Sequence, residues 1–364
     1  MPIYMDRHDV SAGVTAEIVA ELHKEDLKIQ HKYGCRSITY WFDNDRKIAF
    51  CLIDAPNKKA LIDMHNDAHG EVPHKIIEVD EMIVESFLGR IENPEKSHIA
   101  VLNIIDNSAF RILMVIETRN YLNRLESNQY TIFTQKFHNS VTKTLHRFNG
   151  RIVQKDNNHY LVSFKSVSDA VLCALKIQFK FKYVTPKFEP SSHKLKIALS
   201  SGIAVTNKDH IFEDAIVLAT RMCGIVNETL VIAQEVKTLY ENENRNASID
   251  RELARILSPE DEKFLTQLMD FIEKKWNNPD FNVSYFSEEL GYSKSQLYRK
   301  LKALTGQSPN NFLKEFRLHK ALDLLHQQYG NISEIAFETG FNKAAYFSKC
   351  FLDKYGILPS KYIQ

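Results

Sequence analysis

The sequence has no long apolar run, no grouped cysteines and almost no net charge. The 364 residues include 47 Lys and Arg against 46 Asp and Glu, a formal net charge of +1. Apolar runs such as residues 112–116 are far shorter than the roughly 20 residues of a transmembrane helix. The opening residues lack the basic stretch and apolar core of a secretory signal. Five dispersed cysteines favour reduced thiols over a disulfide framework, so we expect a cytoplasmic protein without a membrane partner.

The low net charge is a sum of unlike segments. Residues 1–95 carry 11 basic and 18 acidic side chains (−7), residues 96–263 carry 23 and 18 (+5), and residues 264–364 carry 13 and 10 (+3). Six of the 14 histidines lie in the first 74 residues. Because the length suggests two or three domains, the total charge excludes no nucleic-acid partner.

The order of apolar patterns predicts a multidomain chain. Residues 1–92 read β-α-β-β-α-β, the order of a ferredoxin-like α+β domain. A second α+β domain is expected over 97–240, a polar linker over 241–262, and an all-α domain over 263–364. In the first domain the expected strands are 3–7, 37–42, 47–53 and 75–79, and the expected helices are 14–32 and 58–69.

The last 100 residues contain one helical arrangement twice. A short helix, a turn at Gly291 and a helix starting after Ser293 are followed later by a short helix, a turn at Gly340 and a helix from Asn342. This is the helix-turn-helix design, whose second helix enters the major groove of double-stranded DNA. A helical bundle with a solvated basic face would show the same periodicity. The side chains expected at DNA are Lys294, Ser295, Gln296, Tyr298, Arg299 and Lys302, then Asn342, Lys343, Tyr346 and Lys349.

The residues of this segment resemble a known family. The runs LGYSKSQLYRKLKALTGQSPNNFLKEFRLHKALDLL and ISEIAFETGFNKAAYFSKCFLDKYGILPSKY closely resemble the DNA-binding domain of the AraC/XylS family. The resemblance implies binding to promoter DNA, regulation of transcription and RNA polymerase as a further partner. Asp353 stands where that family usually has a basic residue, so the second unit is expected to hold phosphate less tightly.

The middle segment resembles the class III adenylate/guanylate cyclase domain, in the runs FHNSVTKTLHRFNGRIVQKDNNHYLVSFKSVSDAVLCALKIQ, LKIALSSGIAV and FEDAIVLATRMCGI. Such catalysis needs two carboxylates that hold two metal ions. The matched positions, aligned on Arg124 and Leu125, hold Met114 and the pair Asn157-Asn158. Val217 replaces the asparagine that orients the sugar, whereas Arg221 matches the transition-state arginine.

These replacements imply a domain without nucleotide turnover, and hence no enzyme. A shifted alignment would use Asp106 or Asp156 as a carboxylate. The family forms head-to-tail dimers, so the resemblance implies a homodimer, with nucleotide sensing or a plain spacer as the role of the domain. The alternative function is a nucleotide cyclase fused to a DNA-binding domain.

The histidines of the first segment suggest a metal site. His65 and His69 are four apart on a predicted helix, so both lie on one face. His23 lies on the other helix and His8 ends the first strand; in a ferredoxin-like sandwich these would converge. Surface histidines would give the same spacing. Imidazole suits zinc, copper, iron and nickel, and the sequence does not choose among these metals.

Residues 1–80 also resemble a family of small nickel-binding ferredoxin-like proteins, in the runs MPIYMDRHDV, AELHKEDLKIQHKYG and YWFDNDRKIAFCLIDAPNKKALIDMHNDAHG. The resemblance implies a divalent transition metal, nickel, held by His8, His23, His65 and His69, with Asp26 and His31 in reserve. The sequence thus predicts a DNA-binding transcription regulator that responds to a metal or a small ligand. A metal-buffering protein with a vestigial helical tail is the third hypothesis.

Overall fold

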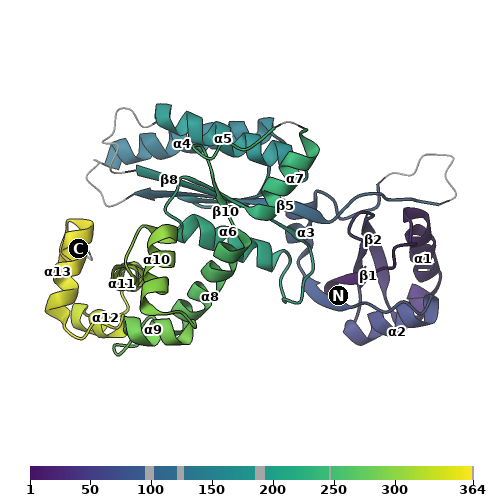
Figure 1. Ribbon diagram of the computed structural model, residues 1–364. Coiled ribbons are helices and arrows are strands. Elements are labelled where there is room, and N and C mark those ends of the chain that lie inside the picture. The colour runs from purple at the N-terminus through teal and green to yellow at the C-terminus, as the bar shows by residue number, and fades with distance from the viewer. Residues whose placement is uncertain (95–101, 121–126, 185–192, 246, 363–364) are drawn as a thin grey trace.

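The computed structural model describes residues 1–94, 102–120, 127–184, 193–245 and 247–362. They form a first sheet unit (residues 3–88), a second sheet unit (110–257) and a helical unit (259–362), with the second sheet unit between the other two (Figure 1). Within these ranges, no helix has both the length and the apolar character that a bilayer span requires.

The first sheet unit has the β-α-β-β-α-β order expected from the sequence. Its sheet is antiparallel with the strand order β2-β3-β1-β4. Val19 and Ala20 of α1 and Leu61 of α2 pack against the same sheet face, so both helices cover that face (Figure 1). Its elements are β1 (Ile3–Asp9), α1 (Ala16–Ile29), the 3-10 helix η1 (Gln30–Tyr33), β2 (Arg36–Asp43), β3 (Ile48–Asp54), α2 (Lys58–Ala68) and β4 (Lys75–Val79).

The other face of this sheet belongs to a core shared with the second sheet unit. Met5, Trp41 and Phe50 are fully buried there, in a cluster that continues into the second sheet. A further helix, α3 (Glu81–Leu88), connects the two units and was not expected from the sequence. Arg111 donates hydrogen bonds to the last carbonyls of α3, at 3.1 Å to that of Phe87 and 3.0 Å to that of Leu88. The first sheet unit is therefore packed on both faces.

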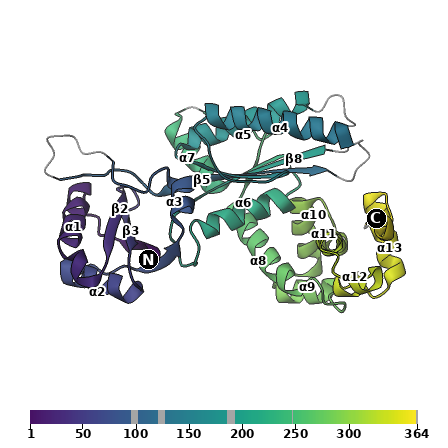
Figure 2. The same ribbon diagram turned by 180° about the vertical axis from the view of Figure 1, so that it is seen from behind.

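The second sheet unit is a six-stranded mixed sheet with the order β10-β9-β8-β5-β7-β6. The pairs β8-β9 and β9-β10 are parallel and the others are antiparallel. Helices α4 and α5 lie along one face and α6 lies on the other (Figures 1 and 2). Its elements are β5 (Phe110–Asn120), α4 (Ser127–Arg147), β6 (Arg151–Lys155), β7 (His159–Phe164), α5 (Val167–Val184), β8 (His193–Ile203), α6 (Glu213–Ile225), β9 (Leu230–Ala233), α7 (Gln234–Glu243) and β10 (Arg255–Leu257).

The expected linker over 241–262 differs from what the structure has there. This stretch contains the end of α7, the edge strand β10 and the start of helix α8 (Pro259–Lys275), and Ala254 and Leu257 within it are buried. The polar run that suggested a linker ends before a short apolar segment that pairs with β9 and extends the sheet by one strand.

The helical unit contains both predicted repeats, joined by α11 (Pro309–His326). The side chain of Ser293 and that of Gln296 form a reciprocal capping box at the start of α10, which fixes where that helix begins. The second repeat differs slightly from expectation, because α13 begins at Ala344 with Lys343 as its N-cap instead of at Asn342. The other helices are α8 (Pro259–Lys275), α9 (Val283–Glu289), α10 (Lys294–Thr305), α12 (Ile332–Glu338), α13 (Ala344–Tyr355) and α14 (Pro359–Tyr362).

Candidate metal centre and nucleic-acid interface

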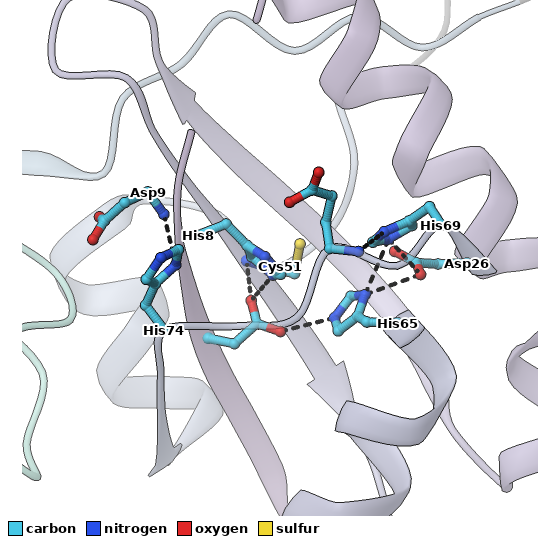
Figure 3. Close-up of polar contacts among 9 residues, drawn as sticks. His8, Asp9, Asp26, Cys51, His65, His69 and His74 are labelled. Carbon is cyan, nitrogen blue, oxygen red and sulfur yellow. Dashed lines mark hydrogen bonds and ion pairs between the residues drawn. The ribbon is translucent and has the colours of Figure 1, made fainter. Parts of the chain in front are cut away.

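A cluster of histidines and carboxylates lies between the first sheet and its two helices (Figure 3). Because successive side chains of a strand point to opposite faces, Asp6 and His8 of β1 share the face that α1 and α2 cover. Cys51 of β3 is the direct cross-strand neighbour of Asp6 and donates its backbone N–H to Asp6 Oδ1 at 2.9 Å. Asp6 is completely buried, so this carboxylate depends on protein partners alone.

The helices supply the other half of the cluster, and His65 of α2 is at its centre (Figure 3). Its Nε2 lies 3.0 Å from Asp6 Oδ2, and its Nδ1 lies 3.0 Å from Oδ1 of Asp26 on α1. His69, one turn further along, places Nε2 3.2 Å from the same Asp26 oxygen. His8 Nε2 lies 3.4 Å from the other oxygen of Asp6. His65 thus bridges two buried carboxylates.

The histidines and carboxylates of this cluster stabilise each other's charged forms. Burial disfavours the charged form of His65, but the hydrogen bonds to Asp26 and Asp6 outweigh burial and raise the pKa of His65 to about 10. Burial likewise opposes ionisation of Asp6, yet His8 and His65 hold the pKa of that carboxyl well below its usual range. A protonated His65 therefore compensates the carboxylates in the absence of another cation.

The donor atoms fit a divalent transition metal. Two groups bring their donor atoms within 4.8 Å of one another: Asp6, His8, Cys51 and His65 in one, and Asp26, His65 and His69 in the other. Imidazole nitrogen suits nickel, copper and zinc, and a thiolate adds preference for soft metals. Both ring nitrogens of His23 are buried and have no hydrogen-bond partner among the described residues, so this side chain has donor capacity that the protein leaves unused.

The structure brings together most of the predicted ligands. His8, His65 and His69 lie in the two groups, and the reserve candidate Asp26 joins them. His23 lies against the Tyr40 ring with centroids 4.9 Å apart and belongs to neither group. The other reserve candidate, His31, is exposed on η1 and also lies outside both groups.

Asp6 and Cys51 were missed by the sequence analysis. Asp6 carries a local signal, because it alternates with His8 on one strand and so shares its face. Cys51 carries none, since its place beside Asp6 follows from strand pairing between segments 45 residues apart.

The side chains predicted to contact DNA are all exposed. On α10 the apolar face of Leu297, Leu301 and Leu304 is buried, which turns the polar face outward. On α13 Phe347 and Phe351 are buried in the same way. The exposed residues are Lys294, Ser295, Gln296, Tyr298, Arg299 and Lys302 of the first repeat, and Asn342, Lys343, Tyr346 and Lys349 of the second, together with the acidic Asp353.

A recess of about 490 Å³ lies between the two repeats. One wall comes from the first turns of α11, with Asn310, Asn311 and Lys314, and the other comes from Lys343 and Tyr346 of the second repeat. Lys343 and Tyr346 are also predicted DNA contacts. The recess is therefore continuous with the exposed polar face of α13.

The positions that matched cyclase catalytic residues lie in the core, in a turn and on a helix surface of the second sheet unit. Met114 is fully buried in β5 between Val162 of β7 and Leu199 of β8, so it is a core residue. Asn157 and Asn158 form the turn between β6 and β7, and Val217 lies partly exposed on α6. Arg124 and Leu125, on which the match was aligned, lie outside the described residues.

Arg221 points to the helical unit. Its Nη2 lies 2.6 Å from Oδ1 of Asp270 and 2.9 Å from Oε2 of Glu273, both on α8. Its side chain is only 11% exposed. The guanidinium thus forms a bridge between α6 and α8.

Comparisons with known proteins agree with two of the three resemblances. Residues 4–79 match the family described as nickel responsive protein SCO4226-like, and residues 286–364 match a helix-turn-helix domain family. A histidine kinase P4 from Formosa agariphila is 42% identical over 106 residues, which cover 29% of this chain and 8% of that protein. An HTH-type transcriptional activator RhaS from Mannheimia succiniciproducens is 35% identical over 89 residues, which cover 23% of this chain and 33% of that protein.

Among solved structures, SCO4226 from Streptomyces coelicolor is 26% identical with a TM-score of 0.20, and the match covers 21% of this chain and 94% of that one. The chain spans a third or less of the length of the two curated relatives named above. Residues 4–79 are therefore similar to the SCO4226-like family, and residues 286–364 are similar to the helix-turn-helix domain that transcriptional regulators such as RhaS contain.

Proposed function

We propose that the chain is a sequence-specific DNA-binding regulator of transcription. The observation that carries the proposal is the pair of helix-turn-helix repeats on α11, each with its apolar face buried and its polar face exposed. In this arrangement α10 and α13 enter successive major grooves of one duplex, about 34 Å apart. Arg299 and Lys349 hold phosphates or guanine edges. Tyr298 and Tyr346, 48% and 55% exposed, offer flat apolar contacts to sugars or thymine methyl groups.

The recess between the repeats supports this geometry. When two helices occupy successive major grooves, the sugar-phosphate backbone between those grooves crosses the gap between them. The recess offers that backbone two ammonium groups, on Lys314 and Lys343, and the amides of Asn310 and Asn311. Contacts of this kind fix the register of a protein on its DNA without reading the sequence.

Selection from a random-sequence duplex pool tests the DNA proposal without assuming a target sequence. The full chain is expected to enrich a site with two elements about one helical turn apart, and fluorescence anisotropy then gives its affinity. The variant Arg299→Ala, Lys349→Ala is expected to lose that affinity while its thermal unfolding is unchanged, because both side chains are exposed. Failure of the native chain to enrich any sequence would contradict the proposal.

We further propose that the first sheet unit is a ferredoxin-like domain that holds a divalent transition metal, nickel, as the input of the regulator. The two groups would be alternative ligand sets, because His65 turns Nδ1 to Asp26 and Nε2 to Asp6. One set is Asp26, His65 and His69, and the other is Asp6, His8, Cys51 and His65. His23, buried beside them without a hydrogen-bond partner among the described residues, would complete the occupied set after a change of rotamer. Isothermal titration of the full chain with nickel, zinc and copper tests the proposal. Equal, non-saturable heats in the native chain and in His65→Asn would count against a metal site.

For the second sheet unit we propose a cyclase-like fold without nucleotide turnover. A buried methionine and an Asn-Asn turn supply no anionic oxygen to the two metal ions that such catalysis needs. Cyclic-nucleotide formation from ATP or GTP with manganese would overturn this inference and favour the fused cyclase. The proposed domain bounds 1–92 and 263–364 are kept, and the second domain is extended from 97–240 to 97–257 because β10 pairs with β9.

A homodimer formed through this unit and contact with RNA polymerase complete the proposed regulator. Sedimentation equilibrium of the full chain tests the dimer. Transcription from the selected site in the presence of purified polymerase tests the second partner, because a regulator should raise or lower the yield relative to a template without the site.

A further inference from the structure

A second recess lies where the second sheet unit meets the helical unit. It has a volume of about 540 Å³, within the range of about 300–1,000 Å³ typical of small-molecule sites. Its base is the edge of the sheet, where β9 and β10 pair in parallel. Gln178 of α5 and Gln234 and Lys237 of α7 form its sides. Ser258, whose side chain caps α8, also borders it, so we name it the seam recess.

The charges that line the seam recess are partly unpaired. Lys237 is held by Glu241 at 2.7 Å. Arg251 and Arg255 also line the recess, and neither has a carboxylate within ion-pair distance among the described residues. A planar guanidinium binds phosphate or carboxylate with two parallel hydrogen bonds. Two arginines without an ion-pair partner can therefore bind an oxyanion in the recess. Glu228 and Glu252 on the exposed rim accept hydrogen bonds and favour hydroxyl groups elsewhere on the ligand.

We propose that the seam recess binds a small polyhydroxylated molecule with one phosphate or carboxylate group, and that the first helix-turn-helix repeat responds to its occupancy through Arg255. The binding half of this inference is independent of the proposed DNA function, whereas the response rests on it. Neither the metal centre nor the cyclase-like positions contribute a side chain to this recess.

The link to the DNA-binding repeat is a set of hydrogen bonds at the end of α10. The last carbonyls of a helix have no partner within the helix and need donors from outside. Arg255 Nη1 donates to the carbonyl of Ala303 at 2.8 Å, and the backbone N–H of Asn227 donates to that of Leu304 at 3.0 Å. Only Nη1 of Arg255 makes this contact, so an oxyanion has Nε and Nη2 to bind. An oxyanion that draws the guanidinium into the recess weakens the bond to the Ala303 carbonyl, which lies at the end of the helix expected to read the major groove.

Isothermal titration of the full chain tests the binding half, with ribose 5-phosphate, gluconate and inorganic phosphate as probes at constant ionic strength. At least one probe is expected to saturate at one site per chain, and Arg251→Gln is expected to weaken it at least tenfold. The matched control Lys208→Gln, exposed and outside the recess, should bind like the native chain. If no probe saturates, or if Arg251→Gln binds like the native chain, the recess is not an oxyanion site. Circular dichroism melting checks that Arg251→Gln is folded.

Fluorescence anisotropy with the selected duplex tests the response. Chloride is adjusted to keep ionic strength fixed, because DNA binding depends steeply on salt. The probe that binds is expected to raise the Kd for DNA at least threefold in the native chain and to leave it unchanged in Arg251→Gln. Binding of the probe without a change in DNA affinity would overturn the response through Arg255. Absence of DNA binding without any probe would instead overturn the proposed function, and the titration would still decide the recess.

Discussion

The bridge made by Arg221 can be tested by its energy. The substitution Arg221→Met keeps the aliphatic stem against α6 and removes the guanidinium, which leaves Asp270 and Glu273 without their partner. Those carboxylates are 54% and 47% exposed, so water replaces the lost contacts at little cost. Exposed pairs contribute about 0.2–1 kcal/mol each, and two pairs on one nearly buried arginine place the expected cost at about 1–2 kcal/mol.

A double-mutant cycle separates this bridge from general destabilisation. The second variant is Asp270→Asn, Glu273→Gln, and the cycle combines it with Arg221→Met. Urea unfolding, followed by circular dichroism and by the fluorescence of the two tryptophans, Trp41 and Trp276, gives the free energies. The expected coupling is about 1 kcal/mol at low salt and smaller at high salt, because screening weakens exposed pairs. Additive free-energy changes, or a coupling energy that is the same at low and high salt, would refute the assignment of Arg221 as a bridge between the second sheet unit and the helical unit.

Four further predictions concern the metal centre and the helical unit. His65→Asn should abolish saturable nickel binding in isothermal titration, while the exposed His210→Asn should not. Leu301→Ala should lower unfolding free energy by about 2–5 kcal/mol in urea, since Leu301 is fully buried. Ser293→Ala should cost about 1 kcal/mol in the same assay by removing the capping box of α10. Gly340→Ala should destabilise more than Gly291→Ala: both have positive φ, but only at Gly340 does the added Cβ meet a backbone oxygen, at 2.9 Å, and equal melting temperatures would contradict this.

Local patterns were sufficient for the first sheet unit and for the helical repeats. In the first helical repeat, the cap residue Ser293 predicts where α10 begins. The leucines at spacings of four and three predict which face of α10 is buried. In the first unit, alternation along β1 and the Asn57 cap of α2 do the same. The helix α3 was missed because it is short and apolar on most sides. It is stabilised by packing in the core that it shares with the second sheet, and the local sequence does not reveal that contact.

Contacts between segments that are distant in the sequence could not be predicted from local patterns. The spacing of His65 and His69 predicts a shared helix face, but the position of Cys51 depends on the pairing of β1 with β3. Arg221 shows the same limit: its partners lie 49 and 52 residues away on α8, and the resemblance to a cyclase assigned it to phosphate chemistry. Edge strand β10 has only three residues and is recognisable only by its partner β9.

The proposed metal response requires a connection from the metal centre to the second sheet unit, and β1 provides one. Asp6 and His8 face the metal centre, whereas Arg7 between them points to the second sheet unit and lies 3.5 Å from the carbonyl of Val205. Lys75 of β4 holds the same loop through Asp209 at 3.0 Å. This loop leads directly into α6, which carries Arg221. A ligand shifts a conformational equilibrium only when it binds the two conformations with different affinities. The metal can therefore act on α8 only if the cluster binds it with different affinities in two conformations that differ in the position of β1.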